Sequence, residues 1–417
     1  MKIWLINQYN MPPEYGHLNR HFNFGKYLKR MGHEPTVFVG SFLHNTKIQM
    51  IEDDSIIRKY ENADYPYYFI KTCDYSSSKL KRIYAMYEFY KNLLKAVKSF
   101  DKPDAILGSS AHPLAAVAAI KLARKFGCQS IVEVRDLWPE SFVAYGIVSR
   151  KNPLLRLLYT GERWVYKNAD KLVFTMEGGK DYIIEQGWNA DQGGSIDINK
   201  VHHINNGVDL EVYNYNKENY QFEDEDLENS TTFKVIYAGS IRLVNNVKSI
   251  VDAAFEIEKL GVENIKFIIY GDGSDRAPLE QYCKENGIDN VVFKGFISKR
   301  YIPYILSKSD LNIIHFEQNK IKKYGASLNK MFEYFASGKP TLSDCEFGYD
   351  LINKYKCGVV IDNADAKRMA KEIIRIKELN VAQYNVLCAN ASSAAEDYDF
   401  INLSHNLVEI LGGRNNE

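Results

Sequence analysis

The sequence predicts an α/β protein made of two doubly wound domains in tandem. The chain has 417 residues, of which 45% are apolar and 25% charged, a composition and length typical of two globular domains. In both halves, short apolar runs alternate with amphipathic helical segments, a pattern typical of parallel sheets covered on both faces. An acidic segment without periodicity, residues 206–232, separates the two halves.

The first half opens with an apolar run at residues 2–7, followed by a polar loop. The segment 20–31 places Phe24, Tyr27 and Leu28 on one helical face, and Gly32 suits its C-terminal end. Further strands are expected at 36–39, 105–108, 130–134 and 171–175, with helices near 80–98, 113–126 and 153–168.

The strand–helix alternation restarts after the acidic segment. We therefore expect an N-terminal domain at 1–205, a linker at 206–232, a C-terminal domain at 233–395, and a final helix at 396–417 that returns to the N-terminal domain. On such sheets ligands bind outside the carboxyl ends of the strands. The strands of the second domain are expected at 233–238, 266–270, 290–294, 311–315, 340–343 and 358–361.

The formal net charge is zero, which disfavours a dedicated nucleic-acid binder. Residues 1–200 carry 28 Lys/Arg against 21 Asp/Glu, and the remainder carries 25 against 32. Either the two domains face different partners, or this unequal distribution of charge is chance scatter plus one acidic linker.

The apolar stretch 114–120 is too short to cross a bilayer, the start does not resemble a signal peptide, and the six cysteines are scattered. These features predict a cytoplasmic protein with reduced thiols.

One motif in the second half, YGASLNKMFEYFASGKP, has the chemistry of a nucleotide site. Ser327 is a good N-cap for a helix over 328–336, and Gly325 permits close approach of a ligand. Amides at this helix start, together with Lys330, can hold a diphosphate, and Glu333 can bind both hydroxyls of a ribose. The alternative is a well-capped structural helix with a solvent-facing glutamate.

This motif resembles the donor-binding motif of retaining glycosyltransferases of family 4. The segments INQYNMPPEYG, EVRDLWPES, INNGVDLEVY, YAGSIRLVNN and IIYGDGSDRAPLE are similar to further parts of the family, in the same order. The similarity is to the branch that builds bacterial O-antigens and capsules. It implies the GT-B fold, in which two doubly wound Rossmann-like domains face each other across a cleft.

The resemblance also implies roles for single residues of the motif. Glu333 matches the second glutamate of the family's E-x7-E motif, which holds the donor ribose. The first glutamate falls at Gly325 and is missing, so the usual contact to the sugar ring is in doubt. The segment whose amides bind the diphosphate corresponds to Ser327, Leu328, Asn329 and Lys330.

Two further segments correspond to donor contacts in the family. Arg242 matches the basic phosphate contact best, although two asparagines replace the Lys–Gly pair of that motif. Gly295, Phe296 and Ile297 match the loop that flanks the nucleobase. As residues following a strand, Phe296 and Ile297 fit the protein core equally well.

In the first domain, His112 matches the histidine that family members place beside the transferred sugar. The alternative is a loop histidine at a helix start. Glu133 and Asp136, at the end of the next strand, are the other catalytic candidates, and an Arg135–Asp136 ion pair is an equal alternative there. Gly16 lies in the first loop, which approaches the diphosphate in the family.

The resemblance implies transfer from a nucleotide-diphosphate sugar with retention at the anomeric carbon. No cluster has metal-ligand spacing, so we expect neither metal nor other cofactor. Because no nucleophile is evident, our hypothesis is a front-face mechanism in which the departing phosphate helps remove the acceptor proton. Two alternatives stay open, a non-catalytic partner of another glycosyltransferase and a nucleotide-sugar epimerase. A dehydrogenase is disfavoured because no G-x-G-x-x-G follows the first strand.

The segment 79–98 combines basic residues with an apolar stripe. Such a helix can attach to an anionic membrane surface, or it can pack its stripe on the sheet and leave a solvated basic face. The family branch extends sugars on a polyprenyl-diphosphate carrier, which implies a lipid-linked glycan acceptor and peripheral attachment to the inner face of the plasma membrane. The stripe comprises Leu80, Ile83, Tyr84, Tyr87, Tyr90, Leu94 and Val97.

Overall fold

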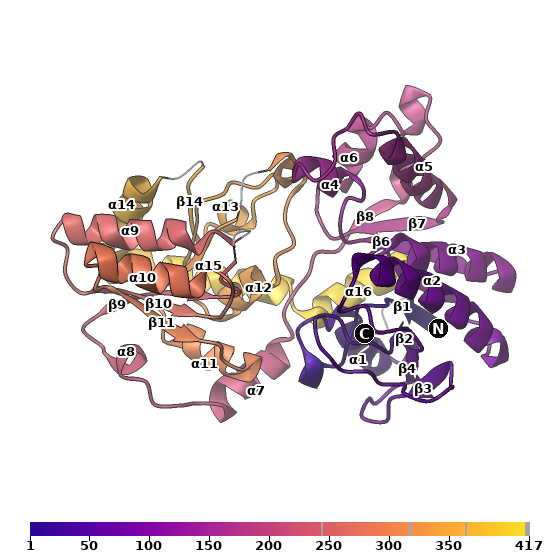
Figure 1. The fold of residues 1–417 in the computed structure, drawn as a ribbon, viewed down its shortest axis with the longest axis horizontal. Helices are drawn as coiled ribbons and strands as arrows, with labels where there is room; N and C mark the ends of the chain where they lie inside the picture. The colour runs from indigo at the N-terminus through magenta and orange to yellow at the C-terminus, as the bar shows by residue number, and fades with distance from the viewer. Residues whose placement is uncertain (243–244, 317–318, 363–364, 413–417) are drawn as a thin grey trace. The chain divides into compact units, whose positions relative to one another are not determined.

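The computed structural model describes residues 1–242, 245–316, 319–362 and 365–412. It divides into two compact units, each containing a parallel sheet with helices packed against it (Figure 1). Unit 1 comprises Met1–Asn205 and the C-terminal segment from Phe400, and unit 2 comprises Asn206–Asp399. The prediction of two doubly wound α/β domains is therefore confirmed.

Unit 1 contains an eight-stranded sheet in the order β3-β4-β2-β1-β5-β6-β7-β8, in which every pair is parallel except β3–β4. Three of these strands, β3, β4 and β8, were not expected, because they are three or four residues long and lack a long apolar run. The strands are β1 Lys2–Ile6, β2 Glu34–Gly40, β3 Ile57–Lys59, β4 Tyr67–Ile70, β5 Ala105–Ser109, β6 Gln129–Val134, β7 Lys171–Phe174 and β8 Val201–His203.

The C-terminal helix α16, Phe400–Ile410, is part of unit 1 and packs against α1, Arg20–Arg30. Phe400 contacts Phe24 edge to face, with 5.6 Å between ring centroids. The other helices of unit 1 are η1 Pro13–Tyr15, α2 Lys79–Ala96, η2 Val97–Ser99, α3 Pro113–Phe126, α4 Glu140–Ala144, α5 Pro153–Asn168, α6 Gly179–Glu185, η3 Ala190–Gln192 and η4 Ile198–Lys200.

Helix α2 does not bury the stripe that its sequence suggests. Its buried residues are Ala85, Phe89, Leu93 and Ala96, which pack toward the sheet and α3. The N-terminal half of the stripe is exposed instead, so the alternative in which the stripe packs on the sheet is wrong for that half. The helix has two apolar faces, and alanine with phenylalanine packs more closely against the sheet than long tyrosines would. The exposed fractions are 78% for Leu80, 62% for Ile83, 56% for Tyr84 and 52% for Tyr87.

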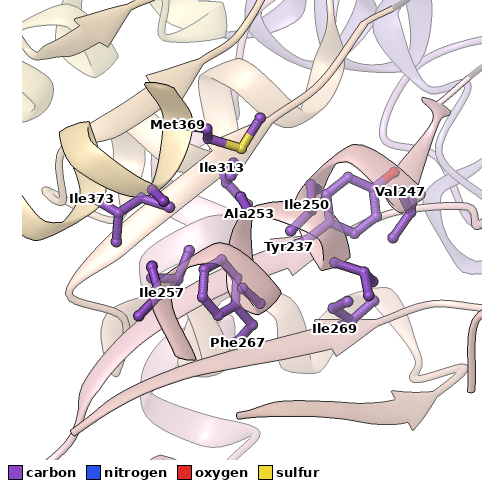
Figure 2. Close-up of a cluster of buried hydrophobic side chains, with 14 of the residues drawn as sticks. Tyr237, Val247, Ile250, Ala253, Ile257, Phe267, Ile269, Ile313, Met369 and Ile373 are labelled. Carbon is purple, nitrogen blue, oxygen red and sulfur yellow. The ribbon is translucent and has the colours of Figure 1, made fainter. Parts of the chain in front are cut away.

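Unit 2 contains a six-stranded, all-parallel sheet in the order β11-β10-β9-β12-β13-β14. Figure 2 shows its core, in which α9 and α14 pack their apolar side chains onto β9, β10 and β12. The strands are β9 Phe233–Ala238, β10 Ile265–Tyr270, β11 Val291–Gly295, β12 Leu311–Ile314, β13 Thr341–Ser343 and β14 Gly358–Val360. The helices are α7 Leu210–Asn219, α8 Glu225–Glu228, α9 Val247–Lys259, α10 Arg276–Asn286, η6 Lys299–Tyr301, α11 Ile302–Ser307, η7 Lys320–Tyr324, α12 Asn329–Ala336, α13 Leu351–Tyr355, α14 Ala366–Lys377 and α15 Val381–Asp397.

The acidic segment expected as a linker is instead folded into unit 2, where it forms α7 and α8. Asp224 caps α8 and accepts a hydrogen bond from Lys294 at 2.9 Å, and Asp226 pairs with the same lysine at 2.6 Å. Helix α8 has only four residues and is attached to β11 through these charged side chains, whereas α7 packs against α11 and buries Tyr213, so neither helix requires a long apolar stripe.

Candidate functional site

The carboxyl ends of β9, β10 and β11 meet through their backbones. The amide of Gly239 donates to the carbonyl of Tyr270 at 3.0 Å, and the amide of Gly271 donates to the carbonyl of Gly295 at 2.8 Å. A Cβ atom on Gly271 would lie 1.8 Å from the carbonyl oxygen of Gly239. Only glycine fits at position 271, and the loops after these strands form one continuous backbone surface.

Lys330 extends from the first turn of α12 toward this surface. Its Nζ donates to the hydroxyl of Tyr237 at 3.2 Å and lies 4.6 Å from the centre of that ring. A Cβ atom on Gly239 would be 3.1 Å from the same nitrogen. Burial lowers the pKa of Lys330 to about 8, although the charge of Glu333 opposes the shift. Lys330 therefore places a compact positive charge beside the loop after β9, where it can pair with a phosphate.

Glu333 lies one turn further along α12 and forms an ion pair with Lys299, with 2.8 Å between Oε1 and Nζ. Lys299 begins η6, directly after the loop that contains Phe296. The ion pair thus brings together the two segments for which the sequence predicts contacts with ribose and nucleobase.

The loop after β11 exposes an aromatic ring. Phe296 is 79% exposed, so the alternative that it belongs to the core is wrong, whereas Ile297 is half-buried. Gly295 has a φ of 78°, and a Cβ atom there would lie 2.7 Å from the guanidinium of Arg276. The tight turn at Gly295 presents Phe296 to solvent.

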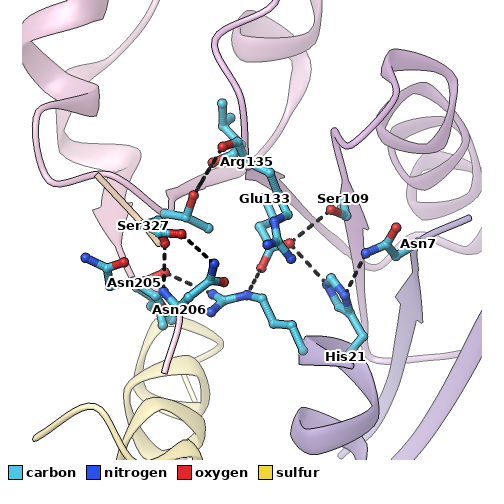
Figure 3. Close-up of polar contacts among 12 residues, drawn as sticks. Asn7, His21, Ser109, Glu133, Arg135, Asn205, Asn206 and Ser327 are labelled. Carbon is cyan, nitrogen blue, oxygen red and sulfur yellow. Dashed lines mark hydrogen bonds and ion pairs between the residues drawn. The ribbon is translucent and has the colours of Figure 1, made fainter. Parts of the chain in front are cut away.

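Ser327 does not cap the helix as expected. Helix α12 begins at Asn329, and its N-cap is Leu328, whose side chain makes no capping bond. The Ser327 hydroxyl instead accepts a hydrogen bond from the amide of Asn206 at 3.0 Å, and its carbonyl accepts from Asn206 Nδ2 at 2.9 Å (Figure 3). Gly325 precedes these residues with a φ of 96°.

Arg242 lies in the loop after β9 and is exposed. A Cβ atom on Gly273, in the loop after β10, would lie 3.1 Å from Arg242 Cγ, so the stem of Arg242 lies beside that loop. Arg242 therefore belongs to the same edge of the sheet as Lys330. Residues 243–244, within the predicted basic motif, lie outside the described part of the chain.

In unit 1, His112 is the N-cap residue of α3 and is 1% exposed. Its ring lies between Tyr9 and Phe89, with centroid distances of 5.7 and 5.8 Å. Neither ring nitrogen has a hydrogen-bond partner among the described residues. Burial, and secondarily the charge of Arg82, lower the pKa of His112 to about 3, so the ring is neutral near pH 7.

Glu133 is fully buried in a network that ties β6 to α1 (Figure 3). Its carboxylate accepts from Arg20 Nε at 2.6 Å and from the Ser109 hydroxyl at 3.0 Å, and His21 Nε2 lies at 3.2 Å. Burial alone would raise the pKa of Glu133, but the charge of Arg20 and the proximity of His21 hold it well below its usual range. These contacts involve both carboxylate oxygens, so the described structure places Glu133 in a buried ion-pair network.

The remaining candidates of unit 1 lie in loops. Asp136 is exposed after β6, and the described residues include no ion pair between it and Arg135. Gly16 follows η1 in extended backbone, and a Cβ atom there would lie 2.7 Å from the sulfur of Met11. A side chain at position 16 would therefore displace Met11.

Sequence reasoning missed two residues of these sites. Gln8, after β1, is 1% exposed, and neither of its amide atoms has a partner within the described ranges. Lys299 was overlooked because its partner, Glu333, is 34 residues away in the chain. The position of Gln8 after the first strand is a signal that could have been used.

The described residues include no group of three or more His, Cys, Asp or Glu side chains placed to hold a metal ion. Within the same residues, no helix has the length and apolar character needed to span a membrane.

Comparisons with known proteins match both halves of the chain. The model for "Glycosyltransferase Family 4" matches residues 19–212, and that for "Glycosyl transferases group 1" matches residues 219–395. A comparison with curated protein sequences found no match.

Several solved structures are similar over nearly their whole length. Sucrose-phosphate synthase (tll1590) from Thermosynechococcus elongatus is 14% identical, with 98% of each chain covered and a TM-score of 0.69. HepE from Anabaena, solved with UDP-glucose, is 16% identical, with 99% of each chain covered and a TM-score of 0.64. WaaG, a glycosyltransferase involved in lipopolysaccharide biosynthesis, is 15% identical, with 99% of this chain and 100% of that chain covered and a TM-score of 0.63. With both domain types matched and the fold shared, the chain is a glycosyltransferase of the GT-B fold.

Proposed function

We propose that this glycosyltransferase moves a sugar from a nucleotide-diphosphate sugar, with retention at the anomeric carbon, to a lipid-linked oligosaccharide or related acceptor in bacterial surface polysaccharide biosynthesis. The observation that carries the proposal is the gathering of Lys330, Glu333 and Phe296 around the carboxyl edge of the sheet in unit 2.

Each part of such a donor has a matching group at this edge. The exposed ring of Phe296 offers a face to a nucleobase, and Glu333 offers a carboxylate to the ribose hydroxyls. Lys330 and the first amides of α12 offer positive charge to the diphosphate. That HepE was solved with UDP-glucose supports this donor class.

The chemistry proposed for unit 1 centres on His112. A neutral, buried ring without a partner among the described residues has hydrogen-bonding capacity for a substrate. Glu133 is held by Arg20 and is unsuited to act as a nucleophile. We therefore retain the front-face mechanism, in which the departing phosphate helps remove the acceptor proton, and Lys330 with the helix amides stabilises the diphosphate.

The acceptor proposal rests on the surface around the start of α2. A cavity of about 580 Å³ is lined there by Lys47, Lys79 and Arg82, together with His44 and Tyr75. No carboxylate in the described part of the chain pairs with these three cations. The cavity therefore suits an anionic acceptor group, and the exposed face of α2 next to it suits a lipid surface. WaaG, which acts in lipopolysaccharide biosynthesis, supports the assignment to surface polysaccharides.

A thermal-shift screen with UDP-, GDP-, dTDP- and CMP-sugars and their free nucleotides tests the donor proposal. Ligand at 100 times its dissociation constant should stabilise the protein by about 2.7 kcal/mol. Lys330→Ala and Glu333→Ala should lose the shift, whereas Lys371→Ala, a change of an exposed residue on α14, should keep it. Equal shifts in all three variants would remove Lys330 and Glu333 from the donor site.

A further inference from the structure

Three neighbouring strands of unit 2 place a histidine and an aspartate at the edge that carries Lys330. In the register of β12 and β13, Ile314 pairs with Ser343, so the next residues, His315 and Asp344, lie side by side. Strand β9 pairs with the other side of β12 in a register that aligns Asn312 with Ile236. Both strands run in the same direction, so Gly239, which follows β9, and His315, which follows β12, lie at the same carboxyl edge of the sheet.

His315 and Asp344 form a buried dyad. Nδ1 of His315 is hydrogen-bonded to Oδ2 of Asp344, and the hydroxyl of Ser249, in the first turn of α9, donates to the same oxygen at 3.3 Å. The side chains are 11% and 1% exposed. In the neutral form of the ring, the carboxylate keeps the proton on Nδ1, and the lone pair then lies on Nε2.

Part of the hydrogen-bonding capacity of the dyad is not used by the described residues. Nε2 of His315 and Oδ1 of Asp344 are buried, and neither has a partner in the ranges that the structure describes. Buried polar atoms are hydrogen-bonded in the great majority of cases, and exceptions often mark functional positions. Lys330, assigned above to the diphosphate, lies beside Gly239, which follows β9, the strand that pairs with β12.

We propose that Nε2 of His315 accepts a hydrogen bond from a hydroxyl of the transferred sugar, and that the dyad thereby selects which sugar is used. The proposal rests on the donor function proposed above. A lone pair on Nε2 attracts a hydroxyl, which has a proton to donate, and disfavours a phosphate oxygen, which has none. A sugar joined to a diphosphate at Lys330 has its hydroxyls near this edge. A site that binds a hydroxyl discriminates strongly against a sugar that lacks or inverts it.

Two substitutions of His315 distinguish the role of Nδ1 from the role of Nε2. His315→Asn keeps a polar group near the position of Nδ1, opposite Asp344, and removes the group at Nε2. His315→Gln extends an amide toward the position of Nε2. The unaltered protein and both variants are titrated by calorimetry with UDP-glucose, UDP-galactose, UDP-N-acetylglucosamine, GDP-mannose and dTDP-rhamnose, and with the free nucleoside diphosphates.

We expect His315→Asn to weaken binding of the preferred nucleotide-sugar about tenfold, with the affinity for the free nucleotide within twofold of the unaltered protein. His315→Gln should retain more of the sugar affinity. Equal losses for nucleotide and nucleotide-sugar would overturn the proposal in favour of a diphosphate contact. No loss for either would overturn it in favour of a packing role.

Deoxy-sugar nucleotides test the same hydrogen bond on the unaltered protein, so this first measurement does not depend on the folding of a variant. One deoxy analogue of the preferred donor should bind the unaltered protein about tenfold more weakly, and the same deletion should have no further effect in His315→Asn. Full additivity of the two changes contradicts the proposal. If the unaltered protein binds no nucleotide-sugar, the donor function itself fails. If it binds one and His315→Asn binds it equally well, only the role of His315 fails.

Discussion

Arg20 and Glu133 form a buried ion pair in which Nε lies 2.6 Å from Oε1 and the two side chains are 4% and 0% exposed. Arg20 also donates to the carbonyl of Ile204 at 2.9 Å, so one guanidinium joins α1, β6 and the end of the N-terminal segment. The pair holds a buried carboxylate at the end of a parallel strand in its ionised form.

Glu133→Gln should therefore act on stability. It leaves the Arg20 charge buried without its counter-ion, and breaking such a pair costs about 3–5 kcal/mol. Urea denaturation of the full chain, followed by the fluorescence of its four tryptophans, which all lie in unit 1, measures the loss. Glu61→Gln, which breaks an exposed pair with Lys59 in the same unit, should cost below about 1 kcal/mol. Unchanged stability with lost turnover would instead support the catalytic role expected for Glu133.

The lowered pKa of Lys330 predicts that donor binding depends on pH. In the free protein burial lowers its pKa to about 8, and a bound diphosphate favours the charged form and raises that pKa. Affinity should be constant below pH 8 and fall above it, with uptake of a proton on binding at pH 8–9. Calorimetry in two buffers of different ionisation enthalpy measures this uptake, and Lys330→Gln should abolish it. An affinity independent of pH from 7 to 9.5 in the unaltered protein contradicts the assignment.

Phe296→Ala should weaken donor binding without destabilising the protein. The ring is 79% exposed, so its removal changes the free energy of unfolding by less than about 0.5 kcal/mol. Loss of base stacking should cost about 1–3 kcal/mol of binding free energy. Phe296→Trp, which keeps an aromatic face, is the matched control. If Phe296→Ala binds the donor as tightly as Phe296→Trp does, the ring does not stack on the base.

The exposed face of α2 predicts attachment to anionic lipid. Leu80→Ser with Ile83→Ser should reduce co-sedimentation with vesicles of phosphatidylcholine and phosphatidylglycerol, because both side chains lie in solvent and can insert into the interface. Val381→Ser on α15 removes a side chain of similar exposure, 76%, and should leave binding unchanged. Sedimentation that is independent of the anionic lipid content excludes the membrane interpretation.

The sequence by itself determined the two-domain α/β fold, because buried parallel strands require continuous apolar runs and their covering helices require apolar periodicity. It also indicated the donor segment, since Gly325, Lys330 and Glu333 lie within nine residues of one another. Neighbours in the chain that share a loop and a helix stay neighbours in space, so local chemistry is readable from local sequence.

Only the tertiary structure decided which polar residues are paired and which are open. Glu133 meets Arg20 across 113 residues of sequence, and Ser327 meets Asn206 across 121. The face that α2 buries was set by close packing of Ala85 and Phe89, and no periodicity distinguishes that face from the other. Side chains distant in sequence become partners only when the strands align, and burial then determines whether a charge is structural or available to a substrate.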